Sequence, residues 1–380
     1  MGDFIIEDGV LVRYAGQGGE VVIPDGVTAI DAEVFTACNA LTGVTIPDSV
    51  CSIGAYAFAD CENLVSVRLP ASLEEIEEGV FSGCNNLRDI TIPDSVYRIG
   101  DHAFANCREL TELVFSETLE IIGESAFNGC MNLKNIRFTG QLYEIGKEAF
   151  AYCHSLKDIT IPAGPTIIDT YAFSFCKRLK SIHLGAMKTL CFGAFAGCKS
   201  LKEISIAAPA DFHGEQIFRG CPGLADENGF VIVRGILYNY YGEDSIVTIP
   251  EGVRHISEGA FRSNERITKV NLPESLEGIG NHAFEVCKNL VDENGFTIVR
   301  GALFGYWGEK TEITIPEGVI AISSFAFYEM EDLTHIYIPA SVTAIGKRAL
   351  ENFDDLTIHT PAGSYAAEYG EMHGLKVVEE

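Results

Sequence analysis

Seven cysteines recur at an interval of 23 residues, and this spacing limits the possible fold more than any other feature of the chain. They are Cys38, Cys61, Cys84, Cys107, Cys130, Cys153 and Cys176; Cys198 then comes one residue early, and Cys221 resumes the interval. After each of two gaps of 43 residues the same position returns, held by Asn264 and Cys287 and then by Met330 and Phe353. A fixed period of roughly 20 to 50 residues indicates a repeat architecture, so we interpret the 380 residues as thirteen units and not as separate globular domains.

The other residues of each unit stand at fixed distances in sequence from its cysteine. In the unit at 90–112, ITIPDSVYRIGDHAFANCRELTE, the alternation around Ile90 and Ile92 predicts a short strand with one buried face. Pro93 ends this strand because proline has no N–H to donate to a ladder. The segment DHAFANC at 101–107 has the length and apolar spacing of one or two helical turns.

No single unit can bury its own Ile, Val, Phe, Leu and Cys side chains. Stacked units bury them as one continuous core, each residue resting on its counterpart in the next coil. The repeat therefore predicts a solenoid of about 13 coils, with short parallel strands and short helical turns. At about 4.8 Å per stacked strand, these coils would extend over about 60 Å or more.

Three related segments stand outside the repeat. They are FIIEDGVLVRYAG at 4–16, FVIVRGILYNYYG at 230–242 and FTIVRGALFGYWG at 296–308, and they align residue for residue. Each joins two apolar runs through a charged residue followed by glycine, which predicts a β-hairpin. The first hairpin is expected to shield the open edge of the first coil, and the other two to begin new blocks of repeats.

The expected organisation is therefore a single repeat domain over residues 1–380. Its parts are an N-terminal hairpin cap at 1–20, repeats at 21–225, an inserted hairpin at 226–247, repeats at 248–291, a second inserted hairpin at 292–313, repeats at 314–361 and a C-terminal cap at 362–380.

The two inserted hairpins are rich in aromatic residues, which makes them candidate binding residues. They carry Tyr238, Tyr240 and Tyr241 and then Phe304, Tyr306 and Trp307, the only tryptophan of the chain. Tyrosine and tryptophan offer a large contact area at a low entropic cost, which favours a binding surface. The alternative interpretation is that these rings cover the core beneath them.

The unit L-x-x-I-x-I-P-x-x-V-x-x-I-G-x-x-A-F-x-x-C resembles the BspA-like leucine-rich repeat family. The matching positions in one unit are Leu87, Ile90, Ile92, Pro93, Val96, Ile99, Gly100, Ala103, Phe104 and Cys107, and the match extends from about residue 21 to 361. The resemblance implies a right-handed solenoid with one strand of each coil on the concave face. It also implies secreted or surface-displayed proteins of bacteria and some protozoa, often adhesins. Departures at Ser116, Thr139, Gly185 and Cys191 and within 206–214 concern local coil shape.

By analogy with that fold, the outward positions of the concave strands are further candidates. Those with side chains suited to contact are Arg68, Arg137, His183 and Tyr337. Strand solubility explains the same side chains equally well, so both interpretations stay open.

Charge and motif content argue against several classes of function. The formal net charge of −27 repels phosphate backbones, so we expect neither nucleic-acid binding nor attachment to anionic membranes. No apolar run approaches a membrane span, and the N-terminus MGDFIIEDGV lacks the pattern of a signal peptide. Neither G-x-S-x-G, H-E-x-x-H nor C-x-x-C occurs, and the nine histidines lack the spacing of metal ligands. The acidic run LEEIEEG at 73–79 is interpreted as a solvated face, and we expect no catalysis, cofactor or metal.

The twelve cysteines are expected to be reduced. Parallel equivalents in stacked coils point the same way, and other residue types fill the same position, so disulfide bonding is not what the position requires. Cys51 and Cys191 lie out of register, and Cys51 is the expected exposed thiol.

These observations predict a non-catalytic interaction module, and the resemblance to the BspA-like family implies an adhesion role, secreted or at the cell surface, in binding a protein or glycan of a host or neighbouring cell. The alternative is an intracellular, cytoplasmic or structural scaffold without a dedicated ligand site.

Overall fold

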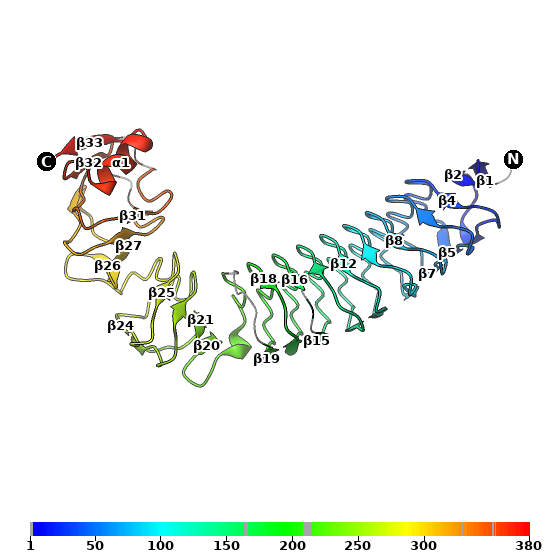
Figure 1. Ribbon diagram of the computed structural model, residues 1–380, viewed down its shortest axis with the longest axis horizontal. Helices are drawn as coiled ribbons and strands as arrows, with labels where there is room; N and C mark the ends of the chain where they lie inside the picture. The colour runs from blue at the N-terminus through cyan, green and yellow to red at the C-terminus, as the bar shows by residue number, and fades with distance from the viewer. Residues whose placement is uncertain are drawn as a thin grey trace. The chain divides into compact units, whose positions relative to one another are not determined.

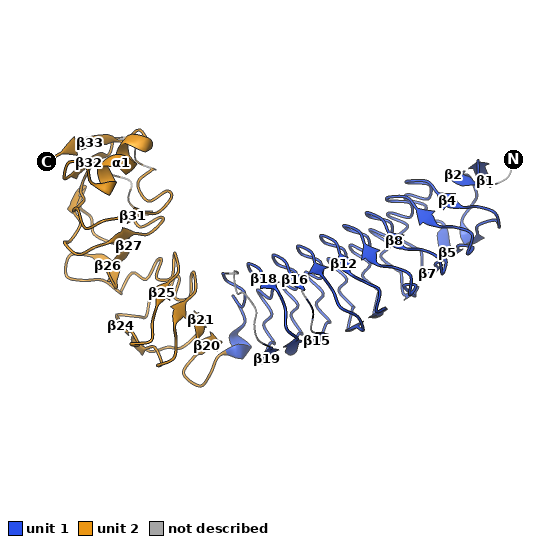
Figure 2. Ribbon diagram, in the orientation of Figure 1, with its two compact units in different colours: residues 1–224 blue, residues 225–380 orange. Residues whose placement is uncertain are grey.

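The computed structural model describes residues 3–162, 164, 166–207, 215–328, 330, 332–351, 353 and 355–380. The chain forms two compact units that meet in sequence between Leu224 and Ala225 (Figure 2). This boundary lies just before the predicted hairpin segment at 226–247. The prediction of one repeat domain stays a prediction, and each unit is described by itself.

Unit 1 is a stack of coils with parallel strands, as the repeat predicts (Figure 1). The longer strands form the first ladder, in three sheets: β3 (Gly19–Val22), β5 (Leu41–Thr45), β7 (Ser66–Arg68) and β9 (Asp89–Ile90); β11 (Glu112–Phe115) and β13 (Asn135–Phe138); β15 (Asp158–Ile161), β17 (Ser181–Leu184) and β19 (Glu203–Ile206). Equivalent residues pair across it, for example Leu113 with Ile136, which are one repeat apart.

Two-residue strands form a second ladder, and each ends in a buried isoleucine or leucine. They are β4 (Ala29–Ile30) and β6 (Ser52–Ile53), then β8 (Glu75–Ile76), β10 (Arg98–Ile99), β12 (Ile121–Ile122), β14 (Glu144–Ile145), β16 (Ile167–Ile168) and β18 (Thr189–Leu190). A 3-10 helix, η1 (Pro222–Leu224), ends the unit.

The segment predicted as one or two helical turns is instead a run of overlapping β-turns. In the coil at 101–107, His102 and Asn106 have φ of 55° and 61°, outside the helical region. Alternate N–H groups there reach the next coil: that of Phe104 donates to the carbonyl of Ala126 at 2.7 Å. The N–H groups between them, such as that of Cys107, close turns onto the carbonyl three residues earlier. Bonds between coils thus replace the bonds within a helix.

The phenylalanine of each coil lies fully buried on its counterpart in the next. The rings stack with centroids 4.8 to 6.0 Å apart along the column Phe35, Phe58, Phe81, Phe104, Phe127, Phe150, Phe173, Phe195 and Phe218. This spacing matches that of neighbouring strands, so one period satisfies both the ladders and the core.

The repeated cysteines are reduced, as expected, and all but the half-buried Cys38 are buried. Each buried thiol donates to the carbonyl of the phenylalanine in the preceding coil at 3.0 to 3.3 Å; the donors are Cys61, Cys84, Cys107, Cys130, Cys153, Cys176, Cys198, Cys221 and Cys287. Among the off-register cysteines, Cys51 is exposed and Cys191 is half-buried. The position therefore suits a small apolar side chain that can satisfy one carbonyl.

Unit 2 repeats the plan in two blocks. Its second-ladder sheets are β20 (Phe230–Val233), β21 (Ile236–Tyr240), β23 (His255–Ile256) and β25 (Gly278–Ile279), then β26 (Phe296–Val299), β27 (Ala302–Tyr306), β29 (Ala321–Ile322) and β31 (Ala344–Ile345). Its first-ladder strands are β22 (Ile246–Thr248) and β24 (Lys269–Asn271), then β28 (Glu312–Thr314), β30 (His335–Tyr337) and β32 (Thr357–Thr360).

The three predicted hairpins are present, and each begins a second-ladder sheet. The first consists of β1 (Phe4–Glu7) and β2 (Val10–Tyr14); the others are β20–β21 and β26–β27. In the second hairpin the turn residues Arg234 and Gly235 both have positive φ, 54° and 80°, as the mirror-image turn of a two-residue hairpin requires. The second strand of each hairpin then pairs in parallel with the next coil, so the whole solenoid has about 16 turns.

The C-terminal segment covers the last coil of unit 2. The helix α1 (Tyr365–Met372) is capped at its N-terminus by Ser364, whose hydroxyl accepts the N–H of Ala367 at 3.2 Å. Its Tyr369 is buried in the same core as the coils. Strand β33 (Lys376–Glu379) then adds to β32 and extends the first ladder.

Candidate functional site

Four of the six hairpin aromatics lie inside the solenoid. Tyr238, Phe304, Tyr306 and Tyr240 are only 2 to 7 % exposed. The Tyr240 ring lies 4.9 Å from the Phe230 ring and 5.5 Å from that of Phe261, and thus continues the phenylalanine column of unit 2. These four rings cover the core, and their faces are not accessible to a partner.

Tyr241 and Trp307 keep part of their surface. Tyr241 is 39 % exposed. Trp307 is half-buried; its indole Nε1 donates to Thr297 Oγ1 at 3.1 Å, and Lys288 Nζ lies 5.3 Å from the ring centroid. The ring also packs over Gly305, where an added Cβ would lie 3.0 Å from it. A binding role for these two residues stays a prediction.

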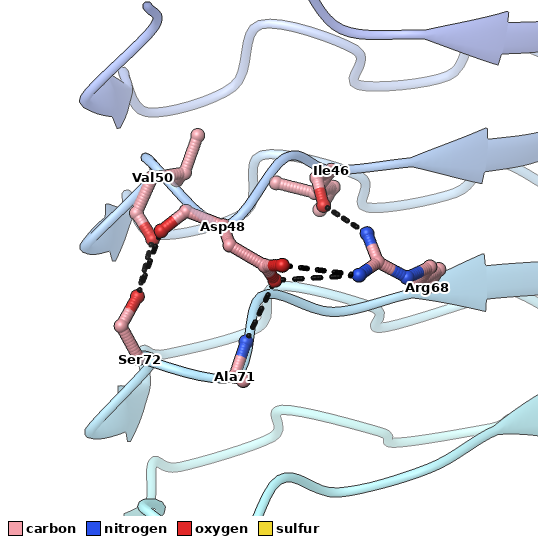
Figure 3. A network of polar contacts seen from close by, with 6 residues as sticks. All are labelled: Ile46, Asp48, Val50, Arg68, Ala71 and Ser72. Atoms are coloured by element: carbon pink, nitrogen blue, oxygen red, sulfur yellow. Dashed lines mark hydrogen bonds and ion pairs between the residues drawn. The ribbon is translucent and has the colours of Figure 1, made fainter. Parts of the chain in front are cut away.

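Arg68, at the end of β7, already has partners within the solenoid. Its guanidinium lies 3.2 Å from Asp48 of the preceding coil and donates to the carbonyl of Ile46 at 3.4 Å (Figure 3). The N–H of Ala71 donates to the same carboxylate, and this bond and the arginine hold the pKa of Asp48 below its usual value. In the same view the hydroxyl of Ser72 donates to the carbonyl of Val50, which links the two coils (Figure 3).

The other three strand-face residues do not form a single site. Arg137 in β13 and His183 in β17 are exposed two coils apart, about 10 Å along the ladder. Tyr337 belongs to unit 2, where its ring stacks on His359 at 4.3 Å and its hydroxyl donates to Glu312 at 3.0 Å. Contact of this face with a partner stays a prediction.

The structure shows a further candidate on the turn side of unit 1, which we call the aromatic pocket. It is a cavity of about 590 Å³ lined chiefly by Tyr152, Tyr171, Phe175, Gly197, Lys199 and Arg219. Tyr152 and Phe175 are 42 % and 40 % exposed, and their rings stack at 5.1 Å with an interplanar angle of 9°. Large apolar rings displayed on a surface in this way indicate a contact site.

The aromatic pocket results from a change of residue between neighbouring coils. Tyr152, Phe175, Gly197 and Gly220 hold the same position, directly before the cysteine, in four successive units. The Phe175 ring leans over Gly197, where an added Cβ would lie 2.7 Å from its Cδ1 atom. Gly197 has no side chain to lean over Gly220 in turn, so the space beside Phe175 is open.

This signal was present in the sequence, as YC, FC, GC and GC at consecutive repeats, but it marks a site only once the coils are known to stack in register. The hairpin aromatics drew attention by their composition instead. Composition does not show which rings the neighbouring coil covers.

No helix among the described residues has both the length and the apolar character that a membrane crossing needs. In the same residues, His, Cys, Asp and Glu side chains do not gather in groups of three or more that could hold a metal ion.

The stacked coils and their parallel ladders define a leucine-rich-repeat solenoid. The model of the BspA type leucine rich repeat region matches in six copies, over residues 17–119, 97–225 and 237–357, so the chain belongs to the BspA-type leucine-rich-repeat family. A search of curated proteins found no match.

Solved structures of leucine-rich-repeat proteins resemble the chain. One from Bacteroides ovatus is 24 % identical, covers 99 % of this chain and 97 % of its own, and has a TM-score of 0.55. A leucine-rich cell surface protein from Faecalibacterium prausnitzii is 27 % identical over 96 % of this chain and 94 % of its own, with a TM-score of 0.45. The first of these supports the fold.

Proposed function

We propose that the chain is a non-catalytic binding module that acts in adhesion, secreted or at a cell surface. The observation that carries this proposal is that each coil has constant buried positions and variable outward positions. The repeated aliphatic, phenylalanine and cysteine side chains are spent on stacking, whereas the outward positions differ from coil to coil, as Thr91, Val114 and Arg137 do. A constant frame with a variable surface suits recognition of a macromolecule.

Family membership supports the same function, because leucine-rich-repeat proteins commonly act in protein–protein interactions. Solenoids offer an extended surface on which many weak contacts add up. The proposed partner is a protein or glycan on a host or neighbouring cell.

The test is binding of the full chain, labelled with a fluorophore, to cultured cells and to immobilised matrix proteins and glycans. We expect saturable binding that unlabelled chain displaces. If the strand face takes part, the double variant Arg137→Ala/His183→Ala weakens binding, whereas the control Tyr143→Ser, exposed elsewhere on the coil, leaves it unchanged. Absence of saturable binding to every surface, with a folded protein, would overturn the proposal in favour of a scaffold without a ligand site.

A further inference from the structure

The aromatic pocket of unit 1 presents a platform for a ring. Phe175 is covered on one side by the parallel ring of Tyr152 and leans over the backbone of Gly197 on the other. Tyr171, four residues before Phe175 in the same coil, packs over Gly193 in the same way. An added Cβ at Gly220 would meet only the backbone of Gly197, at 3.4 Å, so the floor of the cavity is bare main chain.

The fold does not require the aromatic rings of Tyr152 and Phe175. At the same position other coils carry Asp60, Asn106, Gly83 and Gly129, all with positive φ, and these coils stack equally well. Tyr152 and Phe175 adopt the same backbone conformation, φ 61° and 56°, which is unfavourable for bulky residues. The positive φ belongs to this position in other coils too, Ala37 and Val286 included, so what distinguishes Tyr152 and Phe175 is the display of two large rings on the surface.

The charge around the pocket is opposite to that of the chain. Lys199 and Arg219 line it and are exposed, and Glu148 is the one carboxylate among its described lining residues. Among the residues that the structure describes, neither cation forms an ion pair with a carboxylate; Arg219 donates to Gln216 Oε1 at 2.9 Å.

The surrounding sequence extends this contrast. From 177 to 219 the chain has seven lysines and arginines against three aspartates and glutamates, although the whole chain has 27 against 54. A local positive potential within an acidic molecule favours an anionic ligand at this place and opposes one elsewhere.

The aromatic rings and the two cations together favour one class of anionic ligand over others. An inorganic phosphate or sulfate would use the two cations and leave the ring faces unused. An acidic sugar has an apolar C–H face that packs on an aromatic ring, hydroxyls at its rim, and a carboxylate that an arginine binds through paired N–H groups. Gln216 and Glu148 also line the cavity and add an amide and a carboxylate, groups that can pair with sugar hydroxyls.

We infer that the aromatic pocket, with Phe175 as its platform and Lys199 and Arg219 as its cations, binds a carboxylate-bearing pyranose of a surface glycan. This inference rests on the proposed binding function and names the ligand class of one site in it. The cavity volume lies within the range of about 300 to 1,000 Å³ of small-ligand sites, enough for the acidic sugar and part of its neighbour.

The experiment uses the full chain and four probes: sialyllactose and glucuronic acid, which carry the carboxylate, and lactose and sulfate, which lack the acidic ring. Binding is followed by calorimetry and by saturation-transfer NMR. We expect at least one acidic sugar to bind at least tenfold more tightly than lactose, with its ring protons nearest the protein. Comparison of the two acidic probes distinguishes sialic from uronic acids. We also expect affinity to fall as salt rises.

The variants are matched in charge and exposure. Arg219→Gln and Lys199→Gln should each weaken binding at least fivefold, whereas Lys177→Gln and Arg178→Gln, exposed in the same basic segment but outside the lining, should change it less than twofold. Phe175→Asn, which installs the residue found at the equivalent Asn106, should abolish the ring-proton signals without unfolding the coil.

If lactose binds as tightly as the acidic sugars, the role of charge is overturned. If sulfate binds as tightly as they do, the site is a simple anion site and the inference of a sugar ligand is overturned. No binding of either acidic probe, or binding unaffected by Phe175→Asn and Arg219→Gln, would also overturn the inference. If the wild type and those two variants bind cells alike while none of them binds an acidic sugar, the adhesion proposal stands while the pocket inference fails. If neither the wild type nor the variants bind cells, the adhesion proposal fails, and the sugar titration judges the pocket independently.

Discussion

The repeating cysteine serves the solenoid as a small apolar side chain with one weak hydrogen-bond donor. Burial raises the pKa of the Cys61 and Cys287 thiols to about 12 and that of Cys107 well above its ordinary value. A thiol with so high a pKa is almost entirely protonated at neutral pH, and the thiolate is the reactive form. The buried thiols are therefore unreactive while the fold is intact.

Thiol reactivity should divide the twelve cysteines into two groups. In native protein at pH 8, Ellman's reagent should modify Cys51 rapidly and the half-buried Cys38 and Cys191 more slowly. The nine buried thiols should react only after unfolding in guanidinium. Peptide mapping after alkylation checks the assignment, and native modification of the buried set would contradict the packing described here.

A pH-dependent contribution to the stability of unit 2 comes from His282. Its Nδ1 atom lies 3.1 Å from Glu285 Oε2, and that carboxylate raises the pKa of the imidazole, with burial opposing the effect. Burial raises the pKa of Glu285. The charges of His282 and of Arg262, whose Nε lies 3.1 Å away, lower this pKa by a larger amount, so the net shift is downward. Glu258 also favours the charged imidazole.

The signs of these shifts set the pH window. The raised pKa of His282 stabilises the folded state below the unfolded value of about 6.5, and this contribution is lost as pH rises through the folded pKa. The contribution of Glu285 is present above about 4.3 and is lost as pH falls through its lowered pKa.

We therefore expect the urea midpoint of unit 2 to fall between pH 6 and 8 more in the wild type than in His282→Gln. Glutamine is a compatible choice, because Gln216 adopts the same positive φ at the equivalent position. Equal slopes in the two proteins would show that the pair does not contribute.

At the scale of the elements, the phenylalanine column joins the coils of unit 1. Phe127 is fully buried between Phe104 and Phe150, with both ring centroids at 5.1 Å. Phe127→Ala should lower the free energy of unfolding of unit 1 by about 3 to 5 kcal/mol, because it removes both stacking contacts and leaves a cavity. Tyr143→Ser, on the surface, should change it by about 0.5 kcal/mol or less. Chemical denaturation followed by far-UV circular dichroism measures both, and a loss below about 1 kcal/mol in Phe127→Ala would contradict the stacked core.

The third hairpin allows a test of its own through the single tryptophan. Lys288 near the Trp307 ring should draw iodide toward the half-buried indole. Lys288→Gln should therefore reduce quenching of the fluorescence by iodide, whereas quenching by neutral acrylamide should stay the same. An equal change with both quenchers would mean that the substitution altered exposure and not charge.

The strands and hairpins could be predicted because their patterns are local: alternation around Ile90 and Ile92, and a charged residue followed by glycine between apolar runs. The turn at 101–107 could not, since the apolar spacing of Ala103, Phe104 and Cys107 is the same in a helix and in a series of turns. The choice depends on N–H groups that donate to the next coil. The aromatic pocket was missed for a related reason, because it joins residues from several coils.

At the scale of the whole molecule, the coil is the unit of construction. Deletion of residues 90–112 would join Asp89 to Leu113 and leave every following strand in register, because both sides of the junction hold equivalent positions. This variant should fold with the circular dichroism spectrum of the wild type and a unit 1 denaturation slope reduced by the surface of one coil.

Deletion of residues 90–101, about half a coil, is the control. It would bring a turn against a strand and destroy the pairing of the coils beyond it. This variant should aggregate or lose the cooperative transition of unit 1, and equal stability of the two deletions would contradict a ladder held in register.

Because folding buries nine thiols, oxidation of these cysteines competes with folding. An unfolded chain exposes all twelve sulfurs at their ordinary acidity, and in an oxidising compartment the first pairs to meet would be trapped as disulfides that the folded structure does not contain. A chain that folds first passes through the same compartment with nine sulfurs out of reach. In such a compartment the order of folding and oxidation would set which cysteines are oxidised, and the nine buried thiols would stay protected only while the coils remain stacked.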